Sequence, residues 1–270
     1  MPSSTPSLTS ALDRLWFSPL GGGVRRTAQQ TADLLLPVAC VGCGAEATDL
    51  CDECCVDFRL LTRDPFSAAE GAEALPITNV DEHGIHLLPV SSAGLYKTLV
   101  ADVVIAFKDH ERIGLGRVLA PALSRSVRTA LQGVPPGADV LLVWPPSSPR
   151  ARLRRGRSPV EELVSAAALP QRCRAQGPVL NRTRSGMLSL SGLRSQKGRA
   201  KSSRRAAVTQ FELTEQARRA VSGQQVLLID DVLTTGATIH GMYAALTEAG
   251  AFVRGAAVVA VTPRAGLQSE

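Results

Sequence analysis

Short apolar runs alternate along the chain with segments in which apolar residues recur every three or four positions. Runs of the first kind favour buried strands, and they occur at residues 86–91, 139–144, 226–229 and 251–261. The helical spacing is clearest at residues 96–108 and 114–131. Strands that alternate with helices predict a mixed α/β fold, in which a parallel sheet carries helices on both faces.

The apolar run at residues 226–229 is followed by two carboxylates and then by a loop of small, hydroxyl-bearing residues. Open α/β sheets bind ligands outside the carboxyl ends of their strands. Adjacent carboxylates accept hydrogen bonds from vicinal hydroxyls, and the free N–H groups of a loop and helix start suit a phosphate. The pattern therefore predicts a site for a ribose 5-phosphate. Its candidate residues are Asp230, Asp231, Thr234, Thr235, Gly236, Ala237 and Thr238.

Composition leaves room for one α/β domain and a small appendage. The chain has 270 residues and a net charge of +6, and the basic excess is concentrated at residues 150–157 and 182–205. A basic surface suits phosphate-bearing ligands or nucleic acid, and charge alone does not separate the two. No apolar run approaches the roughly 20 residues of a membrane span, and the first residues lack the pattern of a secretory signal. We therefore expect a cytoplasmic protein without membrane insertion.

A second anion site is predicted where the apolar run at residues 139–144 ends. Two prolines follow this run, and an arginine-rich stretch follows the prolines. A cluster of guanidinium groups at a strand end suits a second phosphate or a pyrophosphate. The candidates are Arg150, Arg152, Arg154 and Arg155, with Lys108 as a further one.

Four cysteines near the N-terminus have the spacing of a zinc site. Cys40 and Cys43 form one C-x2-C pair, Cys51 and Cys54 form another, and Cys55 would break the spacing. Paired C-x2-C knuckles supply four thiolates for tetrahedral zinc, which leaves no open position for catalysis. We therefore predict a structural zinc ion. Disulfides, or a redox C-x2-C pair, are the weaker alternatives in a chain without an export signal.

Together the motifs resemble the ComF family, a zinc-finger-bearing branch of the type I phosphoribosyltransferase fold. The stretch IDDVLTTGAT at residues 229–238 looks like the phosphoribosyl-pyrophosphate (PRPP) signature of these transferases. Four other stretches resemble, in order, the family's zinc finger, its helix and lysine motif, its proline turn with RRG, and its basic loop: residues 33–54, 96–110, 143–157 and 180–186.

Composition and the resemblance together predict four parts of the chain. Residues 1–30 would be a flexible segment, 31–60 a zinc-finger-like module, 61–85 a linker or hood, and 86–265 the phosphoribosyltransferase-like domain. Residues 144–146 and 157–159 depart from the family pattern. These departures fall in the pyrophosphate region and leave the ribose-phosphate motif intact, so the resemblance implies binding more firmly than turnover.

Two functions follow from the resemblance. The first is transfer of a phosphoribosyl group from PRPP, with Mg²⁺, to an unidentified nitrogen acceptor. Asp230 and Asp231 would hold the ribose hydroxyls, and the loop after them would hold the 5-phosphate. Purine-salvage relatives carry a proton-accepting Asp in the place of Thr234, so a purine acceptor is disfavoured. The second is a non-catalytic protein that binds PRPP or a nucleotide and acts in DNA uptake, competence or repair through protein or DNA partners.

Overall fold

The computed structural model describes most of the chain, namely residues 38–147, 156–176, 179–182 and 211–263. The chain forms two compact units, one ending at Cys51 and the other beginning at Asp52. The flexible segment predicted at residues 1–30 lies outside the described ranges. Within these ranges, no helix is both long enough and apolar enough to cross a bilayer.

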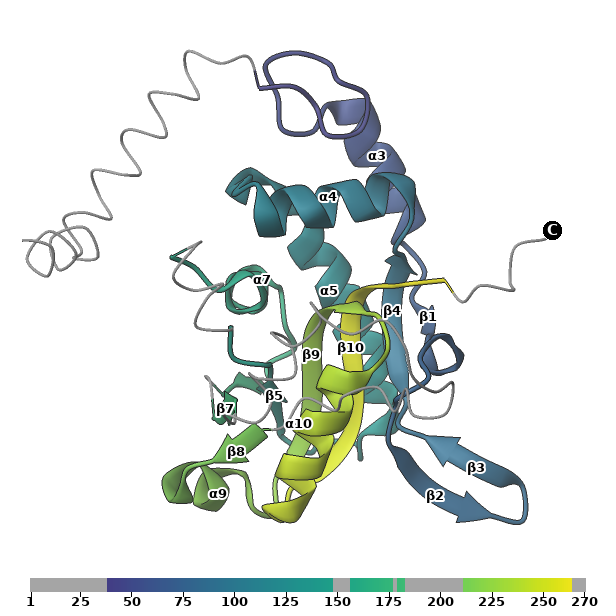
Figure 1. The fold of residues 1–270 in the computed structure, drawn as a ribbon, viewed down its shortest axis with the longest axis vertical. Helices are drawn as coiled ribbons and strands as arrows, with labels where there is room; N and C mark the ends of the chain where they lie inside the picture. The colour runs from purple at the N-terminus through teal and green to yellow at the C-terminus, as the bar shows by residue number, and fades with distance from the viewer. Residues whose placement is uncertain (1–37, 148–155, 177–178, 183–210, 264–270) are drawn as a thin grey trace, which may run out of the picture. The chain divides into compact units, whose positions relative to one another are not determined.

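The larger unit is built on a six-stranded sheet (Figure 1). In spatial order the strands are β1 (Phe66–Ser67), β4 (Val90–Leu95), β10 (Phe252–Val261), β9 (Gln225–Leu233), β5 (Val140–Val143) and β6 (Cys173–Ala175). β1 runs antiparallel to β4 at one edge, and all other neighbours in this sheet are parallel. The predicted mixed α/β fold with a parallel sheet is confirmed.

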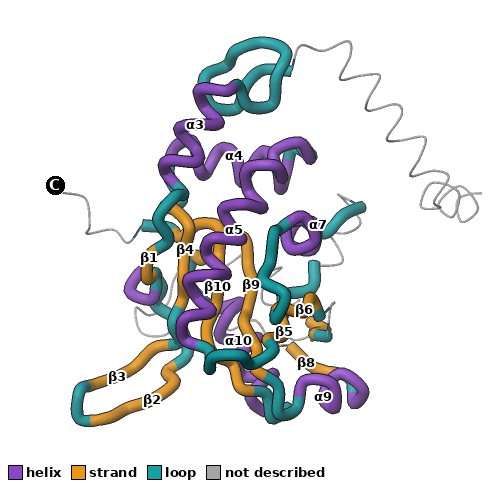
Figure 2. Tube along the Cα trace, turned by 180° about the vertical axis from the view of Figure 1, so that it is seen from behind, coloured by secondary structure: helices purple, strands orange, loops and turns teal. Residues whose placement is uncertain are grey.

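Helices cover both faces of this sheet. α10 (Ala237–Glu248) lies on one face and α5 (Gly116–Ala130) on the opposite one (Figure 1, Figure 2). α5 and α4 (Thr98–Asp109) confirm the two helices predicted from apolar spacing. Further helices are α3 (Asp52–Leu61), α7 (Pro159–Ala166) and α9 (Glu215–Val221).

The strand predicted at residues 86–91 is two separate strands. β3 (Gly84–Leu87) pairs with β2 (Ile77–Asp81) in a hairpin, and β4 begins only at Val90. Pro89 lies between them, and because proline lacks an N–H donor it interrupts a ladder of hydrogen bonds. A second small antiparallel sheet pairs β7 (Leu180–Arg182) with β8 (Phe211–Leu213).

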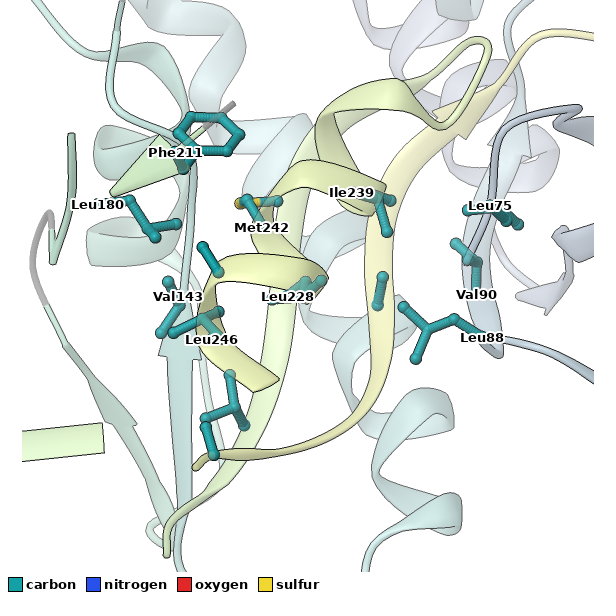
Figure 3. Packing of buried hydrophobic residues seen from close by; sticks show 14 of the residues in the cluster. Leu75, Leu88, Val90, Val143, Leu180, Phe211, Leu228, Ile239, Met242 and Leu246 are labelled. Carbon is teal, nitrogen blue, oxygen red and sulfur yellow. The ribbon is translucent and has the colours of Figure 1, made fainter. Parts of the chain in front are cut away.

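The hydrophobic core packs α10 against the sheet (Figure 3). Ile239, Met242 and Leu246 of α10 are fully buried, at the spacing of one helix face. Leu228 of β9 is fully buried in the same cluster. Each such side chain stabilises the fold by roughly 1.5–3 kcal/mol. This packing fixes the start of α10 relative to the end of β9, where the predicted ribose-phosphate residues lie.

Candidate functional site

The two predicted carboxylates, Asp230 and Asp231, lie within β9 rather than beyond its end. β9 continues past them because β10 stays paired with it as far as Leu233, which lies opposite Val261. On the other side, β5 ends opposite Leu228. The last part of β9 therefore has a sheet neighbour on one side only. This difference in strand length leaves a crevice at the carboxyl end of the sheet.

A pocket of about 340 Å³ lies at this crevice, a size typical of small-ligand sites. Charged side chains of both signs reach it from α4 and β7, and they stand beside an apolar wall. Such a lining suits a small, highly charged ligand that also carries some apolar surface. The lining residues are Tyr96, Val104, Ile105, Lys108, Asp109, Pro145, Arg182, Asp230, Asp231, Val232, Thr234 and Thr238.

Lys108 forms an ion pair with Asp231 inside this pocket. The Nζ atom lies 2.6 Å from Oδ2, and the Asp231 side chain is only 9% exposed. Because the carboxylate is nearly buried, water screens this attraction less than it screens a surface pair. The structure thus places Lys108 beside the acidic pair. Its predicted role in binding an anion stays a prediction.

Asp230 carries a strongly perturbed carboxyl group. Burial raises its pKa to about 7, and the negative charge of Asp231 adds to the rise. The charge of Lys108 and a hydrogen bond from the Asp231 N–H act in the opposite direction without cancelling it. Two neighbouring carboxylates oppose each other's ionisation unless donors or cations are supplied. The pair therefore suits a ligand that brings hydroxyl donors or positive charge.

The loop between β9 and α10, residues 234–238, presents backbone donors at the same place. Among the described residues, no acceptor is found for the N–H groups of Thr238 and Ile239 in the first turn of α10. Asp230, Thr234 and Thr238 are among the residues that line a small hollow here. Free N–H groups and the positive end of the helix dipole favour an anion. This arrangement can accept a phosphate group.

Ala74 and Leu75, which precede the β2–β3 hairpin, contact this loop and the start of α10. The Ala74 N–H donates to the Thr235 carbonyl oxygen at 2.8 Å, and His240 Nδ1 lies 3.1 Å from the Ala74 carbonyl oxygen. Gly236 has a φ of +86°, and a Cβ there would lie 3.1 Å from Cδ2 of Leu75. Glycine is therefore favoured both by its backbone conformation and by this close approach.

Among the polar and charged pocket residues, Tyr96, Asp109 and Arg182 were not predicted as site residues. Arg182 ends β7, and its Nε donates to the Pro146 carbonyl oxygen at 3.2 Å. Burial lowers the pKa of Arg182, while the charge of Asp230 opposes this change. The sequence shows a basic stretch here, but no local pattern tells which arginine lies beside the acidic pair.

The predicted second anion site cannot be placed, because its four arginines lie outside the described residues: Arg150, Arg152, Arg154 and Arg155. The residues that flank this segment are described. Ser147 Oγ donates to Ser158 Oγ at 3.2 Å, so the segment leaves and rejoins the described structure at neighbouring points. The pyrophosphate role of these arginines stays a prediction.

The predicted zinc ligands lie close together. Cys43 Sγ is 3.6 Å from Cys51 Sγ, and the Cys51 N–H donates to Cys40 Sγ at 3.3 Å. Burial raises the pKa of Cys40, but hydrogen bonds from Cys43, Cys51 and Gly42 outweigh it and bring the pKa to about 6. With Cys54, these cysteines form a group of four whose sulfurs lie within 4.8 Å of one another. Four thiolates at such distances can hold a metal ion such as zinc.

Comparisons with known proteins bear on the C-terminal part of the chain. Residues 187–269 match the family model described as the phosphoribosyl transferase domain, and this range contains both carboxylates and the loop after them. No curated protein matches the chain.

Thirteen chains of solved structures match, among them one described as the allosteric regulatory enzyme of purine biosynthesis. That match has 17% identity and a TM-score of 0.29, and it covers 66% of this chain and 34% of the other. This chain therefore spans about a third of that protein's length, and a TM-score so low carries no argument. The sheet topology and the family match together give the chain a phosphoribosyltransferase-like α/β fold.

Proposed function

We propose that the chain binds PRPP, or a closely related 5-phosphoribosyl ligand, together with Mg²⁺. One observation carries the proposal. Asp230 and Asp231 line one pocket with Thr234 and Thr238 of the following loop, within a segment that matches a phosphoribosyl transferase domain. Hydrogen-bond acceptors for a diol therefore lie beside hydrogen-bond donors for a phosphate, as a ribose 5-phosphate requires.

The ribose and the 5-phosphate of this ligand each have matching groups at the site. The ribose hydroxyls donate to the carboxylates of Asp230 and Asp231, and the 5-phosphate accepts hydrogen bonds from the N–H groups of Thr238 and Ile239. Lys108 alone does not offset the negative charge, since the pKa of Asp230 stays raised beside it. This shortfall of positive charge fits a divalent cation that arrives with the ligand. When bound, Mg²⁺ supplies charge that offsets the pyrophosphate.

The ComF-like resemblance extends this proposal to transfer. The bond between ribose C1 and the pyrophosphate oxygen breaks, and a bond from C1 to a nitrogen of the acceptor forms. Positioning and charge stabilisation supply most of such catalysis. Thr234 is exposed and offers no proton acceptor at neutral pH, so the acceptor is not a purine activated from that position.

A second candidate is a non-catalytic protein that binds PRPP or a nucleotide and works in DNA uptake or repair through partners. One observation favours it. Arg157 is the last basic residue of the arginine-rich stretch, and its side chain is only 9% exposed and paired with Glu162. Its charge is therefore not available to a pyrophosphate. In this case the cysteine module, with its zinc ion, is a contact surface for the partner.

Calorimetry with PRPP and Mg²⁺ tests the binding proposal. Wild-type protein is expected to bind, and replacing both Asp230 and Asp231 with asparagine is expected to abolish binding. Asp139→Asn is the matched control, because Asp139 is exposed and paired with Arg174 outside the pocket. Unchanged affinity in the double variant would rule out the assigned site. Pyrophosphate release from PRPP with a panel of bases and amines then separates the two candidates, since acceptor-dependent release requires an enzyme.

A further inference from the structure

We propose that Arg157 is a positioning residue that acts through Phe107 to set where Lys108 meets Asp231. This inference rests on the proposed function, because it concerns how the ribose-binding carboxylates are held.

The guanidinium group of Arg157 is fixed on one side by Glu162 of α7. Its Nε lies 2.8 Å from Oε1 and 2.9 Å from Oε2 of Glu162, and its Nη2 also donates to Oε2. The Arg157 side chain is 9% exposed, whereas that of Glu162 is 36% exposed. A fork of this kind between two planar groups restricts the orientation of both. The arginine is thus held rigidly against the first turns of α7.

The same guanidinium group reaches α4. Its Nη1 donates to the Phe107 carbonyl oxygen at 2.8 Å, and its central carbon, Cζ, lies 4.4 Å from the centroid of the Phe107 ring. Phe107 stands in the last turn of α4, where carbonyl groups have no partner within the helix. Arg157 therefore holds both the backbone and the ring of this buried residue.

Lys108 is the next residue after Phe107, and its Nζ is the atom that lies 2.6 Å from Asp231. A lysine carries its charge at the end of a flexible stem of fixed length. The position and direction of its backbone therefore set which acceptors the charge can reach. By fixing the carbonyl and the ring of Phe107, Arg157 fixes the backbone from which Lys108 extends. The chain of contacts runs from Glu162 through Arg157 and Phe107 to the acidic pair.

The arrangement requires arginine and not simply a positive charge. The contacts to Glu162 and Phe107 use three different nitrogens of one planar group, together with its flat face over a ring. Lysine has a single nitrogen and no flat face. Arg157→Lys is therefore expected to behave like Arg157→Gln at this site, although it keeps the charge.

A test without ligand measures how fast Lys108 reacts with an amine-specific acetylating reagent, read by peptide mass spectrometry. In Arg157→Gln the ion pair loosens, and labelling of Lys108 is expected to rise by roughly three- to fivefold, the factor for an ion pair of modest strength. Lys97, at the other end of α4, is the internal control. Arg174→Gln, which breaks an exposed ion pair elsewhere, is the matched variant and is expected to leave Lys108 unchanged.

Two further variants keep the test decisive if Arg157→Gln does not fold. Glu162→Gln weakens the hydrogen bonds to the guanidinium group and is expected to raise Lys108 labelling by a smaller factor than Arg157→Gln does. Arg157→Lys is expected to raise it by about the same factor as Arg157→Gln. Lys108 labelling that stays at the wild-type rate in folded variants overturns the proposal. This readout needs no PRPP, so it decides the role of Arg157 even if the protein binds no such ligand.

A double-mutant cycle then tests whether the positioning of Lys108 by Arg157 affects ligand binding. PRPP affinity, in the presence of Mg²⁺, is measured for Arg157→Gln, for Lys108→Met and for the two together. If Arg157 acts through Lys108, the double variant binds no more weakly than Lys108→Met alone. Losses that multiply would show that Arg157 acts independently of Lys108, and would overturn the inference.

Discussion

Replacing Asp230 with asparagine is expected to stabilise the fold at alkaline pH and to leave it unchanged at acidic pH. Asparagine keeps the Oδ1 acceptor that lies 2.9 Å from the Asp231 nitrogen, while it removes a negative charge beside Asp231. Burial, together with the Asp231 charge, raises the pKa of Asp230 from 3.8 to about 7. Because the folded-state pKa is the higher one, the contribution of Asp230 to wild-type stability falls as the pH rises from about 4 to about 7.

The size of this loss follows from the rise in pKa. Each pKa unit corresponds to about 1.4 kcal/mol, so the rise amounts to about 4 kcal/mol before solvent screening and to about 2 kcal/mol once it is included. Asp230→Asn cannot ionise at this position, so it does not lose this stability. Its free energy of unfolding should therefore match that of wild type near pH 4 and exceed it by about 2 kcal/mol near pH 8.

Urea unfolding followed by circular dichroism, repeated across this pH range, measures the difference directly. Asp139→Asn is the control, because its exposed carboxylate pairs with Arg174 and is not opposed by a second carboxylate. No pH-dependent gain is expected from it. A difference between Asp230→Asn and wild type that stays constant with pH, or a variant less stable than wild type near pH 8, would refute the electrostatic reasoning.

Other predictions concern the metal and the loop. Metal analysis is expected to find one zinc per chain, lost in Cys40→Ser and kept in Cys173→Ser; native protein without metal would contradict a zinc site. Gly236→Ala is expected to destabilise the fold by about 1–2 kcal/mol through its left-handed backbone and to weaken phosphate binding. Gly137→Ala shares a φ above +70° but has no atom within 4 Å of its Cβ position, so it reports the backbone cost alone. If both glycine variants bind ligand equally well, the contact with Leu75 has no role in shaping the loop.

The fold class and the acidic pair could be predicted from local patterns. Buried strands and amphipathic helices leave different periodicities, and β9, β5, α4 and α5 were predicted in this way. Thr234 and Gly236 were chosen as candidates because a phosphate site needs small residues and hydrogen-bond donors, and residues of these kinds fill positions 234–238. Such features depend on short stretches of chain.

Features that depend on distant parts of the chain could not be predicted. The contact between Lys108 and Asp231 joins the end of α4 to β9, which is distant in the sequence. No local pattern of residues predicts such a contact. Arg182 became a pocket residue only once the fold brought the end of β7 to Pro146, which follows β5. The acidic pair was expected beyond its strand, because sequence alone does not show that β10 extends the pairing past the point where β5 ends.

The most direct test of the central claim is calorimetry of wild-type protein with ribose 5-phosphate, 2-deoxyribose 5-phosphate and ribose. If Asp230 and Asp231 hold the diol, loss of one hydroxyl should weaken binding by about 10- to 100-fold, the value of one hydrogen bond to a charged group. If the loop at residues 234–238 holds the phosphate, ribose should not bind measurably. Equal affinity for the ribose and deoxyribose phosphates, or ribose binding as tightly as its phosphate, would contradict the account.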